Sequence, residues 1–562
     1  MNNVIVVTNS EDIPAALSVA ASLDDYAIYA FDPALLDKLA NAKLKNIKFI
    51  DCSSHASSAS IREWAKINAF EIECKLDIEV KELLPGISIC SWQHLSLHQL
   101  FTVIRWYSNI WENAPSYFSD CIVHVLVNSR PAYHLTCSFI PSILLIQSLL
   151  EFGLGFRAYT YTGNPIETDV LPDIFRDDDT CDFDILSHLP TCFYDYNYFN
   201  SELEASKKSI LNITSRIWPV QVHATKTINV VPFDSVLNKL TGIMSNQLSN
   251  FAEKVTGILD KLLTPYISSP IYRSYQSQHL ATTYKCQLAT YLLLTKYFEC
   301  KKPAKILLSN HDAGFLGPIL AFSESNSIPV VMVTHSKIGY DLAFKGNNIT
   351  HLTHPIQGDC VLDKSGKRVL NFSLAYPEEF NNTTNYPARI KKIGLLLNSI
   401  STYGVMGTSY DIYMDGIRKI HRWCVKNDLE LAIRCRPGET IINALIMDIG
   451  VDLRNIENYL TMPMTEYAQG IDVCLMYDVP TTGQIDFLKR SIPILNPVPV
   501  DLPWFEAKFS NKNVIPRGNI DTILDTLDTF ISDETNLFLF KNSQFGGYVN
   551  LFKNALPLRI FL

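Results

Sequence analysis

Paired cysteines are missing from this chain of 562 residues. Its 13 cysteines are scattered singly, and no two of them have the Cys-x-x-Cys spacing. This pattern excludes a disulfide framework and favours buried thiols in a reducing compartment, so we expect a cytoplasmic protein. It also disfavours a zinc centre, and we expect no metal site.

Positive charge is scarce as well. The chain has 48 Lys and Arg against 57 Asp and Glu, a formal net charge of -9. A nucleic-acid binder needs a basic surface to contact phosphates, so we expect no nucleic-acid partner. Hydrophobic residues make up 47% and charged residues 19% of the chain, which is typical of well-buried globular domains.

Long apolar runs and two common catalytic motifs are also absent. The longest uncharged apolar stretch, near residues 138–150, is too short for a membrane span and ends at Glu151. Any membrane contact would therefore be peripheral. The chain has no G-x-x-x-x-G-K-[ST] loop and no G-x-S-x-G turn, which disfavours phosphate-loop NTPases and α/β hydrolases.

Short apolar runs alternate with stretches of helical spacing. Residues 4–8, 26–31 and 47–50 predict strands, and residues 13–23 and 33–42 predict helices between them. This alternation is typical of a parallel, doubly wound sheet.

A second unit of the same kind starts at residues 392–397 and continues with strands near 429–434 and 471–476. The sequence therefore predicts an α/β fold with two Rossmann-like domains that face each other across a cleft. Ligands would lie at the C-terminal ends of the strands.

The domain boundaries follow from the same patterns. We expect an N-terminal Rossmann-like domain over residues 1–385 and a C-terminal Rossmann-like domain over residues 386–540. Periodicity fails over residues 163–212, which are rich in Asp, Asn, Tyr and Pro and predict an irregular insertion. Residues 541–562 are expected to form a tail that packs back on the first domain or touches a membrane.

The C-terminal unit has polar residues after three predicted strands. Arg434 and Arg436 end one strand and would clamp a phosphate, although a solvated turn explains them equally well. Ser399 and Ser401 follow the first strand of this unit and would meet the same cleft.

The third of these segments is Tyr-Asp-Val-Pro-Thr-Thr-Gly at residues 477–483, between a buried strand and a helix. A phosphate would fit the free N–H groups at such a helix start, and helix capping by a threonine is the simpler alternative. The candidate residues here are Tyr477, Asp478, Thr481, Thr482, Gly483 and, one turn later, Asp486 for a ribose or sugar hydroxyl.

In the N-terminal unit, two predicted strands each lead into a histidine. Ser-Asn-His-Asp-Ala-Gly at residues 309–314 contains His311 and Asp312, and the next strand leads into His335. These residues suit acid–base chemistry or a carboxylate nucleophile at an anomeric carbon. The alternatives are that Asp312 caps the next helix and that His335 is a buried structural histidine.

The segments at 309–314, 334–336, 436–439 and 477–483 together resemble those of bacterial polysaccharide-assembly glycosyltransferases of GT-B type. The resemblance is closest to the retaining β-Kdo transferases of capsule and O-antigen synthesis. It implies a CMP-activated Kdo donor held by the C-terminal domain, with the N-terminal domain as the acceptor and catalytic domain.

The resemblance also implies residue roles. Asp312 would be the nucleophile of a retaining reaction, and His311 and His335 would handle protons or the leaving phosphate. Arg434 and Arg436 would hold the phosphate with the turn at 481–483, and Tyr477 or Asp478 the nucleoside. The donor is a co-substrate, so no cofactor is expected, and the acceptor would be a glycan or a lipid-linked glycan.

Two other readings of the sequence stay open. One is a GT-B transferase with a UDP-sugar, GDP-sugar or polyol-phosphate donor. The other is a non-catalytic GT-B-like scaffold within a polysaccharide-assembly complex.

Overall fold

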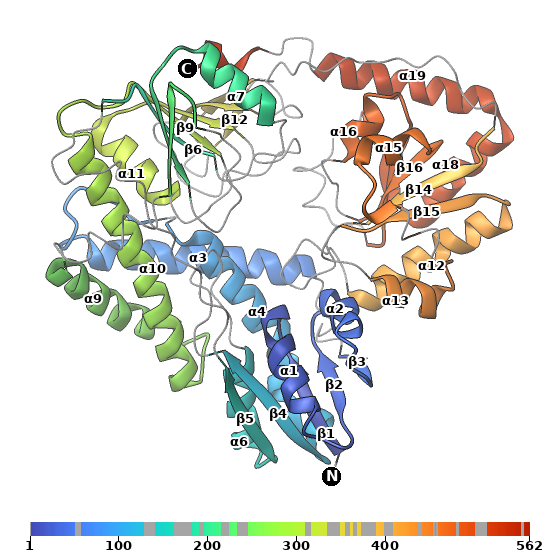
Figure 1. Cartoon of the computed structure of the whole chain (residues 1–562), viewed down its shortest axis with the longest axis horizontal. Coiled ribbons are helices and arrows are strands. Elements are labelled where there is room, and N and C mark those ends of the chain that lie inside the picture. The colour runs from blue at the N-terminus through green and yellow to red at the C-terminus, as the bar shows by residue number, and fades with distance from the viewer. Residues whose placement is uncertain are drawn as a thin grey trace.

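The computed structural model of the chain describes residues 2–50, 58–90, 92–128, 141–161, 182–189, 196–214, 224–232, 245–309, 316–333, 349–353, 360–362, 368–372, 389–397, 409–436, 441–452, 456, 459–478, 483–500, 514–551 and 556–562. Their strands form three sheets that are almost entirely parallel (Figure 1). The predicted fold class, α/β with Rossmann-like parallel sheets, is confirmed. The region 1–385, expected to contain one such domain, contains two of the three sheets.

The first sheet has the strand order β3-β2-β1-β4-β5. Alternate residues of β1 enter different apolar clusters, because Val4 and Val6 face one side and Ile5 and Val7 the other. Burial on both faces is why these strands are continuous apolar runs. The strands are β1 (Asn2–Val7), β2 (Ala27–Ala30), β3 (Ile47–Phe49), β4 (Cys121–Asn128) and β5 (Phe156–Tyr161). The short helices around them are η1 (Ser10–Asp12), α1 (Ile13–Ala20), η2 (Pro33–Leu35), α2 (Leu36–Asn41), α5 (Ala114–Phe118) and α6 (Pro141–Glu151).

The second sheet has the order β12-β13-β11-β10-β9-β6-β7-β8, in which only β12 is antiparallel to its neighbour. The order reverses between β6 and β9, which makes this junction the topological switch point. The strands are β6 (Ile185–His188), β7 (Ile210–Thr214), β8 (Ile228–Pro232), β9 (Lys305–Ser309), β10 (Val330–Val333), β11 (Ile349–Thr353), β12 (Cys360–Leu362) and β13 (Arg368–Phe372).

The prediction of an irregular insertion at 163–212 is wrong for residues 185–212, which contain regular elements. Strands β6 and β7 pair with each other in parallel, and β6 pairs with β9. Helix α7 (Tyr196–Ala205) lies between them in the chain. The polar residues Ser187 and Asn212 interrupt the apolar pattern by which strands are predicted. Inside the sheet, the Ser187 hydroxyl donates a hydrogen bond to Oδ1 of Asn212 at 2.8 Å.

The third sheet has the order β15-β14-β16-β17-β18, with all pairs parallel. Its strands are β14 (Lys392–Leu396), β15 (Glu430–Arg434), β16 (Val473–Met476), β17 (Ile494–Val498) and β18 (Arg517–Asn519). Its helices are α12 (Tyr410–Lys426), α13 (Ile442–Ala444), the π-helical turn η3 (Leu445–Ile449), α15 (Met464–Gln469), α16 (Gln484–Leu488), α18 (Ile520–Ser532) and α19 (Glu534–Leu551).

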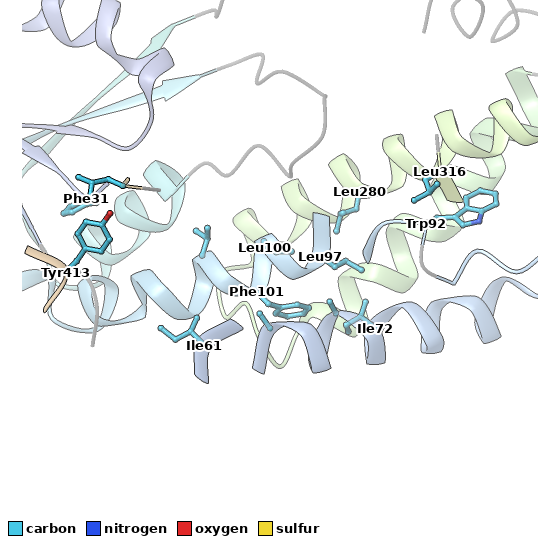
Figure 2. Close-up of a cluster of buried hydrophobic side chains, with 14 of the residues drawn as sticks. Phe31, Ile61, Ile72, Trp92, Leu97, Leu100, Phe101, Leu280, Leu316 and Tyr413 are labelled. Atoms are coloured by element: carbon cyan, nitrogen blue, oxygen red, sulfur yellow. The ribbon is translucent and has the colours of Figure 1, made fainter. Parts of the chain in front are cut away.

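Four long helices and one shorter helix connect the first two sheets (Figure 1). Helices α3 and α4 contact each other, α9 contacts α3 and α10, and α10 contacts α11. Their inward side chains, among them Ile72, Phe101 and Leu280, form part of one large buried cluster (Figure 2). The bounds are α3 (Ser58–Val80), α4 (His94–Glu112), α9 (Ser245–Leu263), α10 (Pro270–Tyr297) and α11 (Leu316–Asn326).

Trp92, which lies between α3 and α4 in the chain, contacts α10 and α11. Its backbone carbonyl accepts a hydrogen bond from Gln287 of α10 at 2.9 Å, and the Gln93 side chain donates to Gln287 at 2.6 Å. Its indole lies against Gly317 of α11, where an added Cβ would be 2.7 Å from the ring and 2.8 Å from the Trp92 backbone. Only glycine therefore fits at position 317.

The chain returns from the third sheet to the second. Helix α19 spans the boundary expected at residue 540, and its Gln544 bonds to Ile494 of β17 and to Val514, which precedes β18. Residues 556–562 then pack on the second sheet, where Leu558 of η4 (Leu558–Ile560) is fully buried. Arg559 pairs with Glu202 of α7 at 3.1 Å. Of the expected tail, residues 556–562 thus lie on the N-terminal part of the chain, whereas residues 541–551 belong to α19.

Gly317→Ala should lower the free energy of unfolding by about 1–3 kcal/mol, because the new methyl group would overlap Trp92. Gly257→Ala in α9 is the matched control, since nothing lies within 4 Å of its added Cβ. That variant should be unchanged or more stable by up to about 1 kcal/mol. Urea denaturation measures both, and equal effects in the two variants would contradict the contact with Trp92.

Acidification should destabilise the chain through His279 of α10. This ring is stacked on Tyr275 with a centroid distance of 6.4 Å, and burial lowers its pKa to about 4. The unfolded chain takes up a proton near pH 6.5 but the folded chain does not, so stability falls as pH drops from about 6.5 to 4, by about 3 kcal/mol. The slope of the unfolding free energy over this window should be smaller in His279→Gln. An identical slope in both proteins would assign the effect to other groups.

Candidate functional site

The C-terminal edge of the third sheet holds most of the described candidate residues. Leu396 pairs with Arg434 on one side and with Met476 on the other. Asn496 of β17 extends this row, because its Nδ2 donates to the backbone oxygens of Met476 and, at 3.1 Å, of Asp478. One row of residues thus crosses four strands where they end.

Arg434 is held in place by aromatic neighbours. Its Nη1 donates to the backbone oxygen of Tyr459, and its guanidinium lies 5.6 Å from the centroid of the Tyr467 ring. Burial lowers the pKa of Arg434, and the nearby Tyr467 and Asp486 oppose that shift. Residues Arg434 and Asp486, both selected from the sequence, are therefore electrostatic neighbours.

Arg436 lies two residues beyond Arg434 and is exposed. Between the two arginines, Cys435 is buried. At this strand end Arg434 is thus partly buried and Arg436 is exposed. Ser399 and Ser401 lie outside the described residues, so their position relative to the two arginines is not described.

Tyr477 is a core residue. Its side chain is fully buried, and its hydroxyl donates to the backbone oxygen of Tyr413 of α12 at 2.6 Å. The two rings meet edge to face with centroids 4.8 Å apart. A ring in this position stabilises α12 on the sheet and has no surface for a nucleoside.

Asp478 makes the turn out of β16. Its φ of 61° is in the left-handed region, which non-glycine residues rarely adopt. Its N–H donates to the backbone oxygen of Pro497 at 2.9 Å, and only 4% of the residue is exposed. The backbone bond and burial hold this unusual turn in place.

Gly483 is the N-cap of α16, and Thr481 and Thr482 lie outside the described residues. Helix α16 has only five residues, so its dipole supplies less attraction for an anion than the sequence suggested.

Two amide side chains beside this turn were missed by the sequence reasoning. Within the described residues, the buried oxygens Oε1 of Gln484 and Oδ1 of Asn496 have no hydrogen-bond partner, at a cost of about 1–3 kcal/mol each. Such groups mark a place where a conformational change or a polar ligand would gain hydrogen bonds. The signal for Asn496 was present in the sequence, as a polar residue inside the apolar run of residues 494–498.

His311, Asp312 and His335 lie outside the described residues. The strands before them are described: β9 ends at Ser309 and β10 at Val333, and the two strands pair with Ser309 opposite Val333. The segments that contain the three candidates therefore start at neighbouring strand ends of the second sheet.

His188 is a further histidine at this edge that the sequence reasoning missed. It ends β6, on the other side of β9 at the switch point, and pairs with Leu308. Its Nδ1 lies 2.8 Å from the backbone oxygen of Ile213. Because a carbonyl only accepts, Nδ1 carries a proton in this contact.

The first sheet has a polar cluster at its own C-terminal edge. Asp12 is buried and accepts hydrogen bonds from Tyr161 at 2.6 Å and from the Thr8 hydroxyl at 2.9 Å. Burial raises the pKa of Asp12, and these hydrogen bonds oppose the shift. Glu11 accepts from Asn128 at 2.7 Å. The carboxylates thus tie the ends of β1, β4 and β5 together.

Metal-ligating side chains do not gather anywhere in the described residues. Within them, no cluster of three or more His, Cys, Asp or Glu is placed to hold a metal ion. Among the same parts of the chain, no helix is both long and apolar enough to cross a membrane.

Comparisons with known proteins give structural likenesses only. No family model matches the sequence, and no curated protein matches it. A UDP-forming α,α-trehalose-phosphate synthase from Burkholderia xenovorans has a TM-score of 0.38 at 8% identity over 67% of this chain and 98% of its own. A glycotransferase of kitacinnamycin has a TM-score of 0.37 at 9% identity over 67% of this chain and 96% of its own.

A UDP-N-acetylglucosamine 2-epimerase has a TM-score of 0.32 at 13% identity over 64% of this chain and 90% of its own. Scores of this size describe a partial resemblance of the chain trace. They assign no activity, and the proteins named include both transferases and an epimerase.

Proposed function

We propose that this chain is a glycosyltransferase of GT-B type that uses a nucleotide-activated sugar. The observation that carries the proposal is the C-terminal edge of the third sheet, where Arg434 is fixed by Tyr459 and Tyr467 beside Asp486. A positioned guanidinium binds phosphate through two parallel hydrogen bonds, and a carboxylate accepts from ribose or sugar hydroxyls. Arg436 at the same strand end adds a second positive charge.

The second sheet supports the same assignment. Its strand order reverses between β6 and β9, and polar residues such as Ser309 and His188 end these two strands. The return of residues 556–562 onto this sheet joins the second and third sheets a second time, as expected for a GT-B enzyme. In this proposal the second sheet belongs to the acceptor and catalytic domain and the third to the donor domain.

The finer proposal is transfer of Kdo from CMP-Kdo with retention, and it rests on the resemblance of the sequence motifs. Asp312 would attack the anomeric carbon, forming a carbon–oxygen bond as CMP leaves with the electron pair. An acceptor hydroxyl would then displace Asp312 and lose its proton to His311 or His335. A monophosphate leaving group develops less charge than a diphosphate, so the chemistry needs no resident cofactor.

The acceptor in this proposal is a bacterial surface polysaccharide or its lipid-linked precursor. A lipid-linked acceptor would bring the chain to the inner face of the cytoplasmic membrane as a peripheral protein. Leu556 and Ile560, which are 40% and 58% exposed on the returning segment, are the apolar side chains available there.

CMP should raise the melting temperature of the purified protein more than CDP, UMP, UDP, GDP or ADP. Arg436→Ala should weaken CMP binding about tenfold or more, because it removes a charge-assisted hydrogen bond. Arg418→Ala is the matched control, since it removes one positive charge from α12, where Arg418 pairs with Asp415 at 3.1 Å. Titration calorimetry on the three proteins measures the affinities.

A stronger shift with a nucleoside diphosphate would keep the transferase and replace Kdo with a UDP- or GDP-sugar. Absence of binding by any nucleotide would overturn the enzyme assignment and leave the scaffold. Equal losses in Arg436→Ala and Arg418→Ala would show that only net charge matters.

Asp312→Asn should bind CMP normally but transfer sugar at least a thousandfold more slowly, because the amide is a poor nucleophile. Mass spectrometry should detect a glycosyl adduct on the wild-type protein and none on the variant. The matched control is Asp472→Asn, whose carboxylate accepts from the Lys391 and Lys392 N–H groups at the opposite end of β14. Full transfer by Asp312→Asn would remove this residue from the mechanism.

A further inference from the structure

Asp37 of the first sheet reaches into the third sheet. Its carboxylate accepts from the N–H of Ile442 at 2.6 Å, the N–H of Asn443 at 3.1 Å and the Asn443 side chain at 2.9 Å. Only 3% of Asp37 is exposed. Figure 1 shows the two elements next to each other, α2 from the start of the chain and α13 from its last third.

This contact replaces a cap that α13 lacks. The first N–H groups of a helix have no partner within it and usually bond to an N-cap side chain. The N-cap of α13 is Ile441, whose apolar side chain accepts nothing. Asp37, 405 residues earlier in the chain, supplies the missing acceptor. The start of α13 is therefore set by the first sheet.

The position of α13 matters because it begins six residues after Arg436. Ile441, the N-cap of α13, bonds through its backbone to Cys435, which lies between the two arginines at the end of β15. Burial raises the pKa of Cys435 to about 12, with a further upward contribution from the charge of Asp37. Asp37 is thus electrostatically close to the strand end that the proposed function assigns to phosphate.

The first sheet also contacts the start of α12. Phe49 of β3 packs against Tyr410 with ring centroids 4.7 Å apart. Tyr410 is the first residue of α12, which follows the segment that contains Ser399 and Ser401. Phe31 and Tyr413 belong to the same buried cluster, labelled together in Figure 2. The first sheet thus contacts the starts of both helices that follow the candidate loops of β14 and β15.

We propose that the first sheet positions the nucleotide-binding edge of the third sheet, and that Asp37 is its main positioning residue. The inference rests on the proposed function for the identity of the ligand. Asp37 holds the start of α13, and Ile441, the N-cap of α13, bonds through its backbone to Cys435 between the two arginines. Removal of the carboxylate should loosen this connection between α13 and the end of β15, and so weaken phosphate binding while the three sheets stay folded.

The test compares Asp37→Ala with Asp32→Ala. Asp32 is a matched control because it is equally buried, at 4% exposure, and caps η2 of its own sheet by accepting from the Ala34 N–H at 2.9 Å. Titration calorimetry with CMP should show binding at least tenfold weaker in Asp37→Ala and within twofold of wild type in Asp32→Ala. Hydrogen exchange should speed up at the Ile442 and Asn443 amides only in Asp37→Ala.

If Asp37→Ala fails to fold, Asn443→Ala tests the same contact from the other side. It removes one of the three hydrogen bonds and should weaken binding less, by about threefold. Faster exchange at Ile442 with unchanged CMP affinity would overturn the positioning role and leave the proposed function standing. A wild-type protein that binds no nucleotide would overturn both, and its exchange data would still report whether Asp37 caps α13.

Discussion

Burial of one continuous apolar cluster holds the three sheets together. Val4 of the first sheet, Leu186 of the second and Ile393 of the third all belong to it. The hydrophobic effect behind such a cluster is strong but has no direction, so it brings the sheets together without fixing their orientation. The directional contacts do that: Gln287 to Trp92 on one side and Asp37 to α13 on the other. Both are hydrogen bonds between residues far apart in the sequence.

The three sheets present different chemistry at equivalent places. Each has polar residues where its parallel strands end. In open α/β sheets, loops and side chains at this edge leave room for a ligand. In the first sheet the residues are carboxylates such as Asp12, whose hydrogen bonds come from the same sheet. In the third sheet they include Arg434, and the neighbouring amide oxygens of Gln484 and Asn496 have no hydrogen-bond partner in the part of the chain that the structure describes. Among the described residues, the third edge is the one that combines positive charge with unused hydrogen-bonding capacity.

The sequence predicted those elements whose hydrophobic pattern is local. Strands β14, β15 and β16 occur within two residues of their expected bounds, because the apolar residues of each strand follow one another closely in the sequence. Strand β6 was missed because it has four residues and ends in Ser187 and His188, whose polarity is compensated by partners on β7. The cap on α13 was beyond prediction, since Asp37 looks like any helical carboxylate. Tyr477 was misassigned for a similar reason: an aromatic residue at a strand end has the same appearance whether it faces a ligand or a helix.

The packing of Leu558 against the second sheet affects how the chain is made. Strands β6 and β9 leave the ribosome early, but the side chain that completes their cluster follows roughly 250 residues after Ser309. At 5–20 residues per second, that interval lasts about 10 to 50 s. During this time the surface meant for Leu558 is exposed, and the third sheet is synthesised beside it. A growing chain of this kind is a natural client for chaperones that bind transiently exposed apolar surface.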